Sequence, residues 1–115
     1  MSDDCLFCKI AAGDIPATIV HEDNHVVAFE DINPQAPHHL VIIPRQHIAT
    51  VNDLEPDHEP LIGKLAAAAK AIAAERGFEQ SGYRLVMNCN SAAGQTVFHI
   101  HMHVLGGRNL SLPPG

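Results

Sequence analysis

The chain has 115 residues, of which 46% are hydrophobic and 17% charged. It therefore holds enough apolar material for one packed domain over residues 1–115, and too few residues for two. Lys and Arg number 7 against 13 Asp and Glu, and the net charge of −6 argues against nucleic acid or an anionic membrane as a partner. Three cysteines, an acidic N-terminus and the lack of an apolar run of ~20 residues lead us to expect a cytoplasmic protein.

The first part of the chain predicts a short helix followed by three strands. Residues 5–12 fit the helix. Two β-branched runs, 18–21 and 25–29, are separated by three polar residues and predict a hairpin. Residues 39–44 read as a third strand that is apolar on both faces, and we therefore expect it at the centre of a sheet.

The second part predicts one long helix and two further strands. The helix spans residues 57–76, with Asp57 as its N-cap and Gly77 just past its end. It carries an apolar stripe formed by Leu61, Leu65, Ala68, Ala69 and Ile72. Residues 83–88 and 98–105 read as strands. Hairpins combined with a single long helix indicate an α+β fold with a largely antiparallel sheet.

Three histidines alternate along the last predicted strand. Because successive side chains of a strand point to opposite faces, His99, His101 and His103 should share one face, with the apolar residues between them facing the long helix. A solvent-facing polar row is one interpretation. A metal site is another, but the outer two histidines would lie ~13 Å apart, so one ion could not bind all three.

The interpretation we favour is acid–base and nucleophilic chemistry on a phosphoryl group. Imidazole has an ordinary pKa near ~6.5, so it can attack when neutral and donate a proton when charged. The turn Gly94-Gln95-Thr96 lies just upstream and could direct backbone N–H groups at an anion. No lysine lies near this segment, which favours a monophosphate ester or amide over a nucleoside triphosphate.

Together these motifs resemble the histidine triad (HIT) family, and within it the Hint branch of nucleoside phosphoramidate hydrolases. The likeness covers nearly the whole chain: the histidine ladder with Gly94-Gln95-Thr96 before it, the segment 29–37, His39 with the strand after it, and the Pro113-Pro114-Gly115 end. The resemblance implies a five-stranded antiparallel sheet with one long and one short helix. It also implies a homodimer whose sheets join, and a pocket for a purine nucleoside monophosphate.

The resemblance further implies roles for individual residues. His101 would attack the α-phosphorus to form a nucleotidyl-histidine, and His103 would contact the phosphate and assist the leaving group. His99 and Thr96 complete the implied catalytic set. Asp31 would bind the ribose, although an Asp at the start of a loop can also simply close an Asx turn. The other implied substrate contacts are Asn88, Gly94 and Gln95 at the phosphate, and Leu6, Phe7, Ile10, Phe29 and Ile32 at the base, where ordinary core packing is the alternative.

The pair Cys5-x-x-Cys8 admits a redox motif, two free thiols or a metal site. Some members of the family hold structural zinc with such a pair, so the resemblance implies zinc at Cys5, Cys8, His39 and His99, while catalysis needs no cofactor. One departure concerns Leu112, which stands where animal members present a tryptophan from the partner subunit. The preference for the leaving group is therefore left open.

The expected function is that of a nucleotide-binding hydrolase cleaving the P–N bond of purine nucleoside phosphoramidates. Two alternatives stay open. The first is a nucleotide-binding regulatory protein with vestigial activity, and the second is a dinucleoside polyphosphate hydrolase. A complete histidine ladder speaks against the first, because binding alone does not require three aligned imidazoles.

Overall fold

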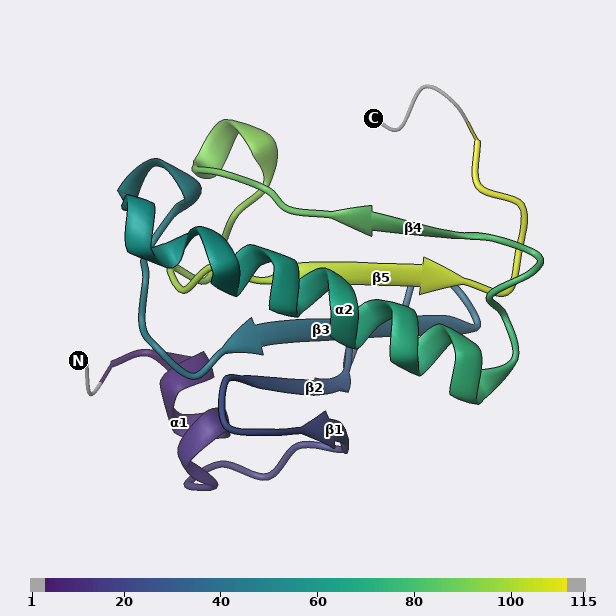
Figure 1. Cartoon of the computed structure of the whole chain (residues 1–115), viewed down its shortest axis with the longest axis horizontal. Helices are drawn as coiled ribbons and strands as arrows, with labels where there is room; N and C mark the ends of the chain where they lie inside the picture. Colours follow the sequence, from purple (N-terminus) through teal and green to yellow (C-terminus); the bar gives the residue numbers. More distant parts are fainter. Residues whose placement is uncertain (1–3, 112–115) are drawn as a thin grey trace.

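The computed structural model describes residues 4–111 and contains one layer of antiparallel strands between two helices (Figure 1). The five strands form a single sheet in the order β1-β2-β3-β5-β4, and every neighbouring pair is antiparallel. The elements are α1 (Leu6–Ala12), β1 (Ile19–Glu22), β2 (Val26–Glu30), β3 (His38–Pro44), α2 (Glu59–Arg76), β4 (Tyr83–Val86) and β5 (Met102–Gly106). The predicted α+β fold with a five-stranded antiparallel sheet and two helices is confirmed.

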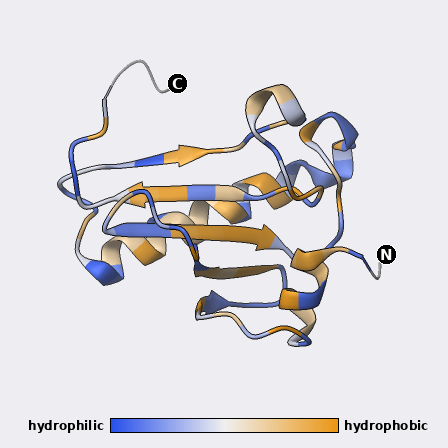
Figure 2. Cartoon of the chain, turned by 180° about the vertical axis from the view of Figure 1, so that it is seen from behind, coloured by the Kyte–Doolittle hydropathy of each residue, from blue (hydrophilic) through white to orange (hydrophobic). Residues whose placement is uncertain are grey.

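The strands alternate between two apolar faces, each covered by one helix. Leu40 and Ile42 of β3 lie in the core that packs against α2, whereas Val41 and Ile43 lie in the core that packs against α1. The long helix passes in front of the sheet in Figure 1 and behind it in Figure 2. Because β3 is buried on both faces, it occupies the central position that its uninterrupted apolar sequence predicted.

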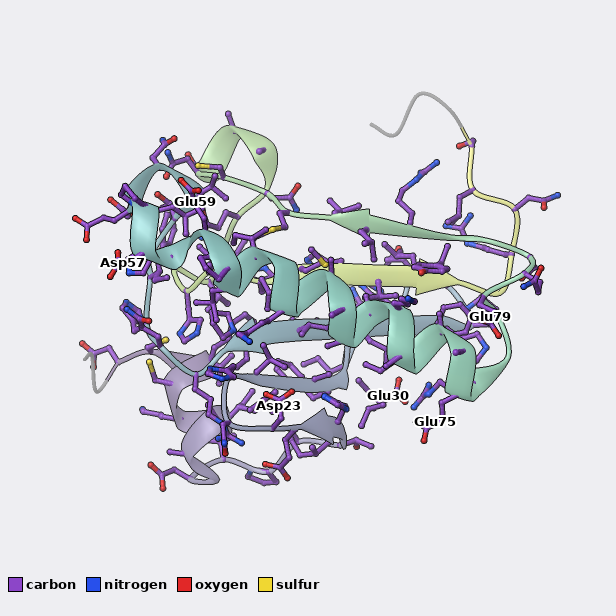
Figure 3. All side chains as sticks on the ribbon, in the orientation of Figure 1. Asp23, Glu30, Asp57, Glu59, Glu75 and Glu79 are labelled. Carbon is purple, nitrogen blue, oxygen red and sulfur yellow. The ribbon has the colours of Figure 1, made fainter. Side chains whose placement is uncertain are left out.

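The long helix begins two residues later than predicted, and Asp57 is not its N-cap. Pro56 fixes a helical φ and starts a separate 3-10 turn, Pro56–His58, so that Asp57 lies inside this turn. In Figure 3, Asp57 lies outside α2, at the same end of the helix as Glu59, its first residue. The end of the helix is as predicted, with Gly77 at φ 82° as the C-cap. The predicted stripe is buried from Leu65 onward, while Leu61 is only partly buried.

The last strand is shorter than predicted, beginning at Met102 rather than at residue 98. Ile42 and Met102 are the last paired residues of β3 and β5, and the next position of β3 that could bond across is Pro44, which has no N–H. The chain before Met102 bonds elsewhere: the N–H of Ile100 donates to the carbonyl oxygen of Ile48 at 2.7 Å. Within residues 4–111, no helix is long and apolar enough to cross a membrane.

Candidate active site

The three histidines of the ladder lie on the α1 side of the sheet. His103 is in β5, opposite Val41, whose side chain belongs to the core under α1. The rings of His101 and His103 are 5.1 Å apart between centroids, and Phe7 of α1 contacts the rings of both His101 and His99, at 5.0 and 6.0 Å. The shared face that the alternation predicted is therefore present, although His99 and His101 precede the strand.

The central histidine is held in one tautomer by the backbone. Nδ1–H of His101 donates to the carbonyl oxygen of His99 at 2.8 Å, and the ring is 8% exposed. When the ring is neutral, this hydrogen bond leaves Nε2 without a proton. An oriented imidazole with a lone pair on Nε2 has the geometry of a nucleophile.

A chain of hydrogen bonds orients His103 through His39. The backbone N–H of Gln35 donates to Nδ1 of His39 at 3.0 Å, so that the proton of His39 is on Nε2, which donates to Nδ1 of His103 at 2.9 Å. A neutral His103 therefore carries its own proton on Nε2. One oxygen of Asp31 lies 3.3 Å from Nε2 of His39 and 3.8 Å from Nδ1 of His103. The sequence did not indicate this role for His39, because only the sheet register brings it beside His103.

Burial favours the neutral form of His103. Its pKa is lowered from 6.5 to about 4, first by desolvation and then by the nearby rings of His101 and His39, while Asp31 acts in the opposite direction. A negatively charged group placed next to His103 would favour its protonated form. The charge state of this ring thus depends on whether an anion is present.

A cavity of about 370 Å³ opens beside His101 and His103. Its volume is that of a small-molecule site, for which roughly 300–1,000 Å³ is usual. Most of the residues that the family resemblance assigned to substrate line it, namely Leu6, Phe7, Ile10, Phe29, Asp31, Ile32, Gly94, Thr96, His101 and His103. Apolar side chains from α1 and β2 form one part of the wall, and the turn before the histidines forms another.

Two of the residues assigned to substrate do not line this cavity. Asn88 is half-buried just after β4 and is not among the lining residues. Gln95 is 3% exposed, and its side chain bonds to backbone groups inside the protein and so does not face the cavity. Asp31 lies on the cavity wall but also closes an Asx turn, since its Oδ1 accepts the N–H of Asn33 at 2.8 Å. The position of Asp31 is therefore compatible both with a ribose contact and with an Asx turn.

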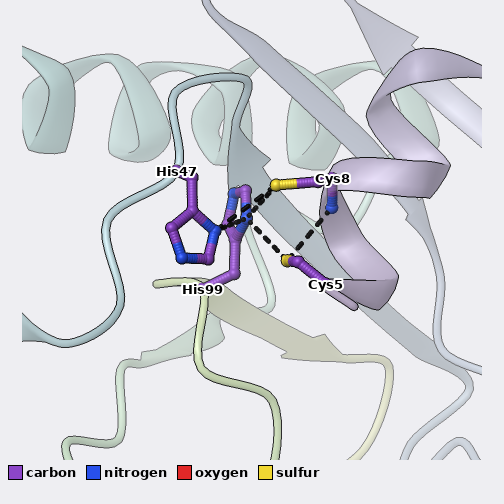
Figure 4. A group of neighbouring side chains, drawn as sticks. All are labelled: Cys5, Cys8, His47 and His99. Atoms are coloured by element: carbon purple, nitrogen blue, oxygen red, sulfur yellow. Dashed lines mark hydrogen bonds between the residues drawn. The ribbon is translucent and has the colours of Figure 1, made fainter. Parts of the chain in front are cut away.

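At the His99 end of the ladder, four side chains from three distant segments bring their metal-binding atoms together (Figure 4). They are Cys5 and Cys8 at the start of α1, His47 after β3, and His99. The expected fourth residue, His39, is wrong: it is five residues before Pro44 in β3, about 17 Å along an extended strand. His99 is beside Pro44, to whose carbonyl oxygen its Nε2–H donates at 2.7 Å, so only a histidine beyond that end of β3 can reach it.

The spacing of the four atoms fits a tetrahedral zinc ion. With Zn–S near ~2.3 Å and Zn–N near ~2.05 Å, tetrahedral angles require ligand separations of about 3.35 Å for N–N and about 3.55 Å for S–N. The Nδ1 atoms of His47 and His99 are 3.3 Å apart, and the sulfur–nitrogen distances are 3.3 to 3.5 Å. Burial lowers the pKa of His99, and its Nε2–H is held by a carbonyl, so Nδ1 is the unprotonated atom.

Comparison with known proteins finds relatives that match nearly the whole chain. Residues 4–111 match the family model described as scavenger mRNA decapping enzyme C-term binding. The chain is 49% identical over 110 residues to the purine nucleoside phosphoramidase of Escherichia coli strain K12, covering 96% of this chain and 92% of that protein. It is 50% identical, over all of both chains, to an uncharacterized HIT-like protein of Synechococcus elongatus. A HIT family hydrolase structure from Legionella pneumophila superposes with a TM-score of 0.95 at 55% identity, covering 97% of this chain and 100% of that one.

Proposed function

Because the chain belongs to the histidine triad family, we propose that it is a hydrolase that cleaves the P–N bond of purine nucleoside phosphoramidates. The observation that carries the proposal is the orientation of His101, whose Nδ1–H is bonded to the carbonyl oxygen of His99 beside a cavity of nucleotide size. The phosphoramidase of Escherichia coli, at 49% identity, supports the choice of substrate class.

In this mechanism His101 is the nucleophile. Its Nε2 attacks the α-phosphorus, a P–Nε2 bond forms and the P–N bond to the amine breaks. The amine gains one proton as it leaves, and the water that later hydrolyses the nucleotidyl-histidine gives one up. His103 would donate the proton to the leaving amine from Nε2 and later accept the proton that the water gives up. The phosphoryl anion makes this possible because it favours the protonated form of the His103 ring.

The other parts of the cavity would bind the nucleoside. Apolar side chains of α1 and β2, with Phe7 and Phe29 in edge-to-face contact at 5.5 Å, would hold the purine. Asp31 would accept hydrogen bonds from the ribose hydroxyls, since each carboxylate oxygen has two lone pairs and one is used by Asn33. Gly94 and Thr96 would face the phosphate.

Hydrolysis of adenosine 5′-phosphoramidate by wild type and His101→Asn tests the proposal. We expect turnover by the wild type and a loss of about 1,000-fold or more in the variant, because the amide of asparagine lacks the ring nitrogen that would bond to phosphorus. His25→Asn, which removes an exposed histidine outside the site, is the matched control. Retained turnover in His101→Asn would refute the nucleophile. Binding of AMP without turnover by the wild type would refute the hydrolase and indicate a regulatory nucleotide-binding protein.

We also propose that Cys5, Cys8, His47 and His99 hold one structural zinc ion. The metal would neutralise the two thiolates and fasten the start of α1, which carries part of the cavity wall, to the segment next to His101. Metal analysis of the purified protein should give one zinc per chain. His47→Ala should lose it and His39→Ala should keep it; the reverse result would restore the ligand set expected from the sequence.

We propose finally that two copies pair through β4 in the cytoplasm. Among residues 4–111 this strand pairs with β5 alone, and Leu85 on it is 40% exposed, so its outer edge can accept a second copy. None of the three cysteines is in a disulfide bond, as is usual in a reducing compartment. Light scattering should give about twice the 12.4 kDa of one chain, and Leu85→Lys should lower it. A wild-type mass of one chain would refute the pairing.

A further inference from the structure

The side chain of Gln95 is buried beside the cavity without lining it. Its Oε1 accepts the N–H of Asn90 at 2.7 Å, and its Nε2 donates to the carbonyl oxygens of Ala49 at 2.8 Å and Val97 at 3.1 Å. Both protons of the amide are therefore used inside the protein. A buried amide with its donors and acceptor matched in this way fixes the segments that it joins.

One of the segments that Gln95 holds is strained. Asn90 has a φ of 69°, and among the described residues it is the only one other than glycine in the left-handed region. Such a conformation persists only where the surroundings hold it. The carbonyl oxygen of Asn90 accepts the N–H groups of Ala93 and Gln95 at 3.2 and 3.1 Å, and its own N–H is bound by the Gln95 side chain. Gln95 thus supplies two of the three hydrogen bonds that hold Asn90.

The same amide ties the turn to the backbone next to the nucleophile. Ala49 belongs to the segment after β3, and the preceding residue, Ile48, accepts the N–H of Ile100 at 2.7 Å. Ile100 directly precedes His101. The place of the turn relative to His101 therefore depends on two hydrogen bonds to adjacent carbonyls of one segment, and Gln95 makes one of them.

From this arrangement we propose that Gln95 is a positioning residue, which sets Gly94 and Thr96 against His101 without touching the nucleotide itself. Gly94 and Thr96 flank Gln95 and line the cavity, and the inward anchoring of Gln95 turns both toward the phosphoryl group. The role rests on the proposed function, since it gives these two residues the phosphate. A misplacement of about 1 Å at a reacting group can cost about 100-fold in rate.

Two substitutions separate the contributions of the amide. Gln95→Met keeps the size and removes all three hydrogen bonds, while Gln95→Glu keeps an acceptor for Asn90 and sets a carboxylate against the carbonyl oxygens of Ala49 and Val97. Gln80→Met, at an exposed residue after α2, is the matched control. For each protein we would measure kcat and KM on adenosine 5′-phosphoramidate, dissociation constants for AMP and for adenosine, and amide hydrogen exchange at residues 90–94, below the unfolding midpoint.

For Gln95→Met we expect kcat to fall by about tenfold to 100-fold. AMP binding should weaken, adenosine binding should stay within twofold, and hydrogen exchange at residues 90–94 should accelerate. Faster exchange with kcat and AMP binding unchanged would reduce Gln95 to a purely structural residue. Weaker AMP binding with unchanged exchange would make it a direct contact. If the wild type hydrolyses no phosphoramidate, the proposed function fails, while the comparison of AMP, adenosine and exchange still decides the role of Gln95.

Discussion

The ring of His103 should make the stability of this protein depend on pH in a defined window. Its pKa is about 4 in the folded protein and 6.5 as the ordinary value, mainly because the ring is buried. Between these values the unfolded chain binds a proton at this site and the folded chain does not. The contribution of this ring to stability is therefore greatest above pH 6.5 and falls as the pH decreases toward 4. A difference of about 2.5 pKa units corresponds to about 3 kcal/mol.

The measurement is urea unfolding of wild type and His103→Asn at several pH values between 7.5 and 4. As the pH falls across this range, the wild type should lose more unfolding free energy than His103→Asn, by up to about 3 kcal/mol. His99, whose pKa is lowered too, acts in both proteins and cancels in the difference. Asp23, whose pKa is lowered from 3.8 to about 2 mainly by the backbone N–H of His25, acts below the window.

The same ring should take up a proton when a phosphate binds. An anion in the cavity favours the imidazolium form, so AMP binding at pH 6 should be accompanied by uptake of up to about one proton, measured by calorimetry in buffers of different ionisation enthalpy. The uptake should disappear in His103→Asn and persist in His25→Asn. A pH-independent stability difference together with no proton uptake would refute the assignment of His103 as a buried ring that becomes charged next to phosphate.

Two further predictions concern packing and the metal group. A Cβ at Gly106 would lie 2.6 Å from Cδ2 of Phe78, which is buried, so Gly106→Ala should lower the free energy of unfolding by about 1–3 kcal/mol. Gly63→Ala, at an exposed position of α2 with open space around it, should raise that free energy by about 0.5–1 kcal/mol; equal effects in urea unfolding would contradict both. Zinc at 100 times its dissociation constant should stabilise the wild type by about 2.7 kcal/mol and leave Cys8→Ala unchanged. A zinc-independent unfolding midpoint in the wild type would count against the site.

Local pattern was sufficient for the elements, whereas most of the residues that line the cavity were expected only from the family resemblance. The β-branched runs predicted the hairpin of β1 and β2, and the uninterrupted apolar run predicted the central place of β3. The alternation of His99, His101 and His103 with apolar residues predicted a shared face, because the period of a strand is a property of the backbone. The element ends were less predictable: Pro56 displaced the start of α2, and Pro44 ended the pairing of β5.

Only the tertiary structure decided which distant residues meet. The sequence offers His38, His39 and His47 around β3, and nothing local says which of them reaches Cys5 and Cys8. The antiparallel register brings His39 beside His103, inside β5, and leaves His47, which lies beyond the end of β3, for His99, which precedes β5. The inward orientation of the Gln95 side chain was likewise decided by the tertiary structure. A polar side chain in a turn points outward unless a distant group binds it, and here the carbonyl oxygen of Ala49 does so. Periodicity is fixed by the covalent chain, whereas partners depend on strand register and loop path, which the whole fold determines.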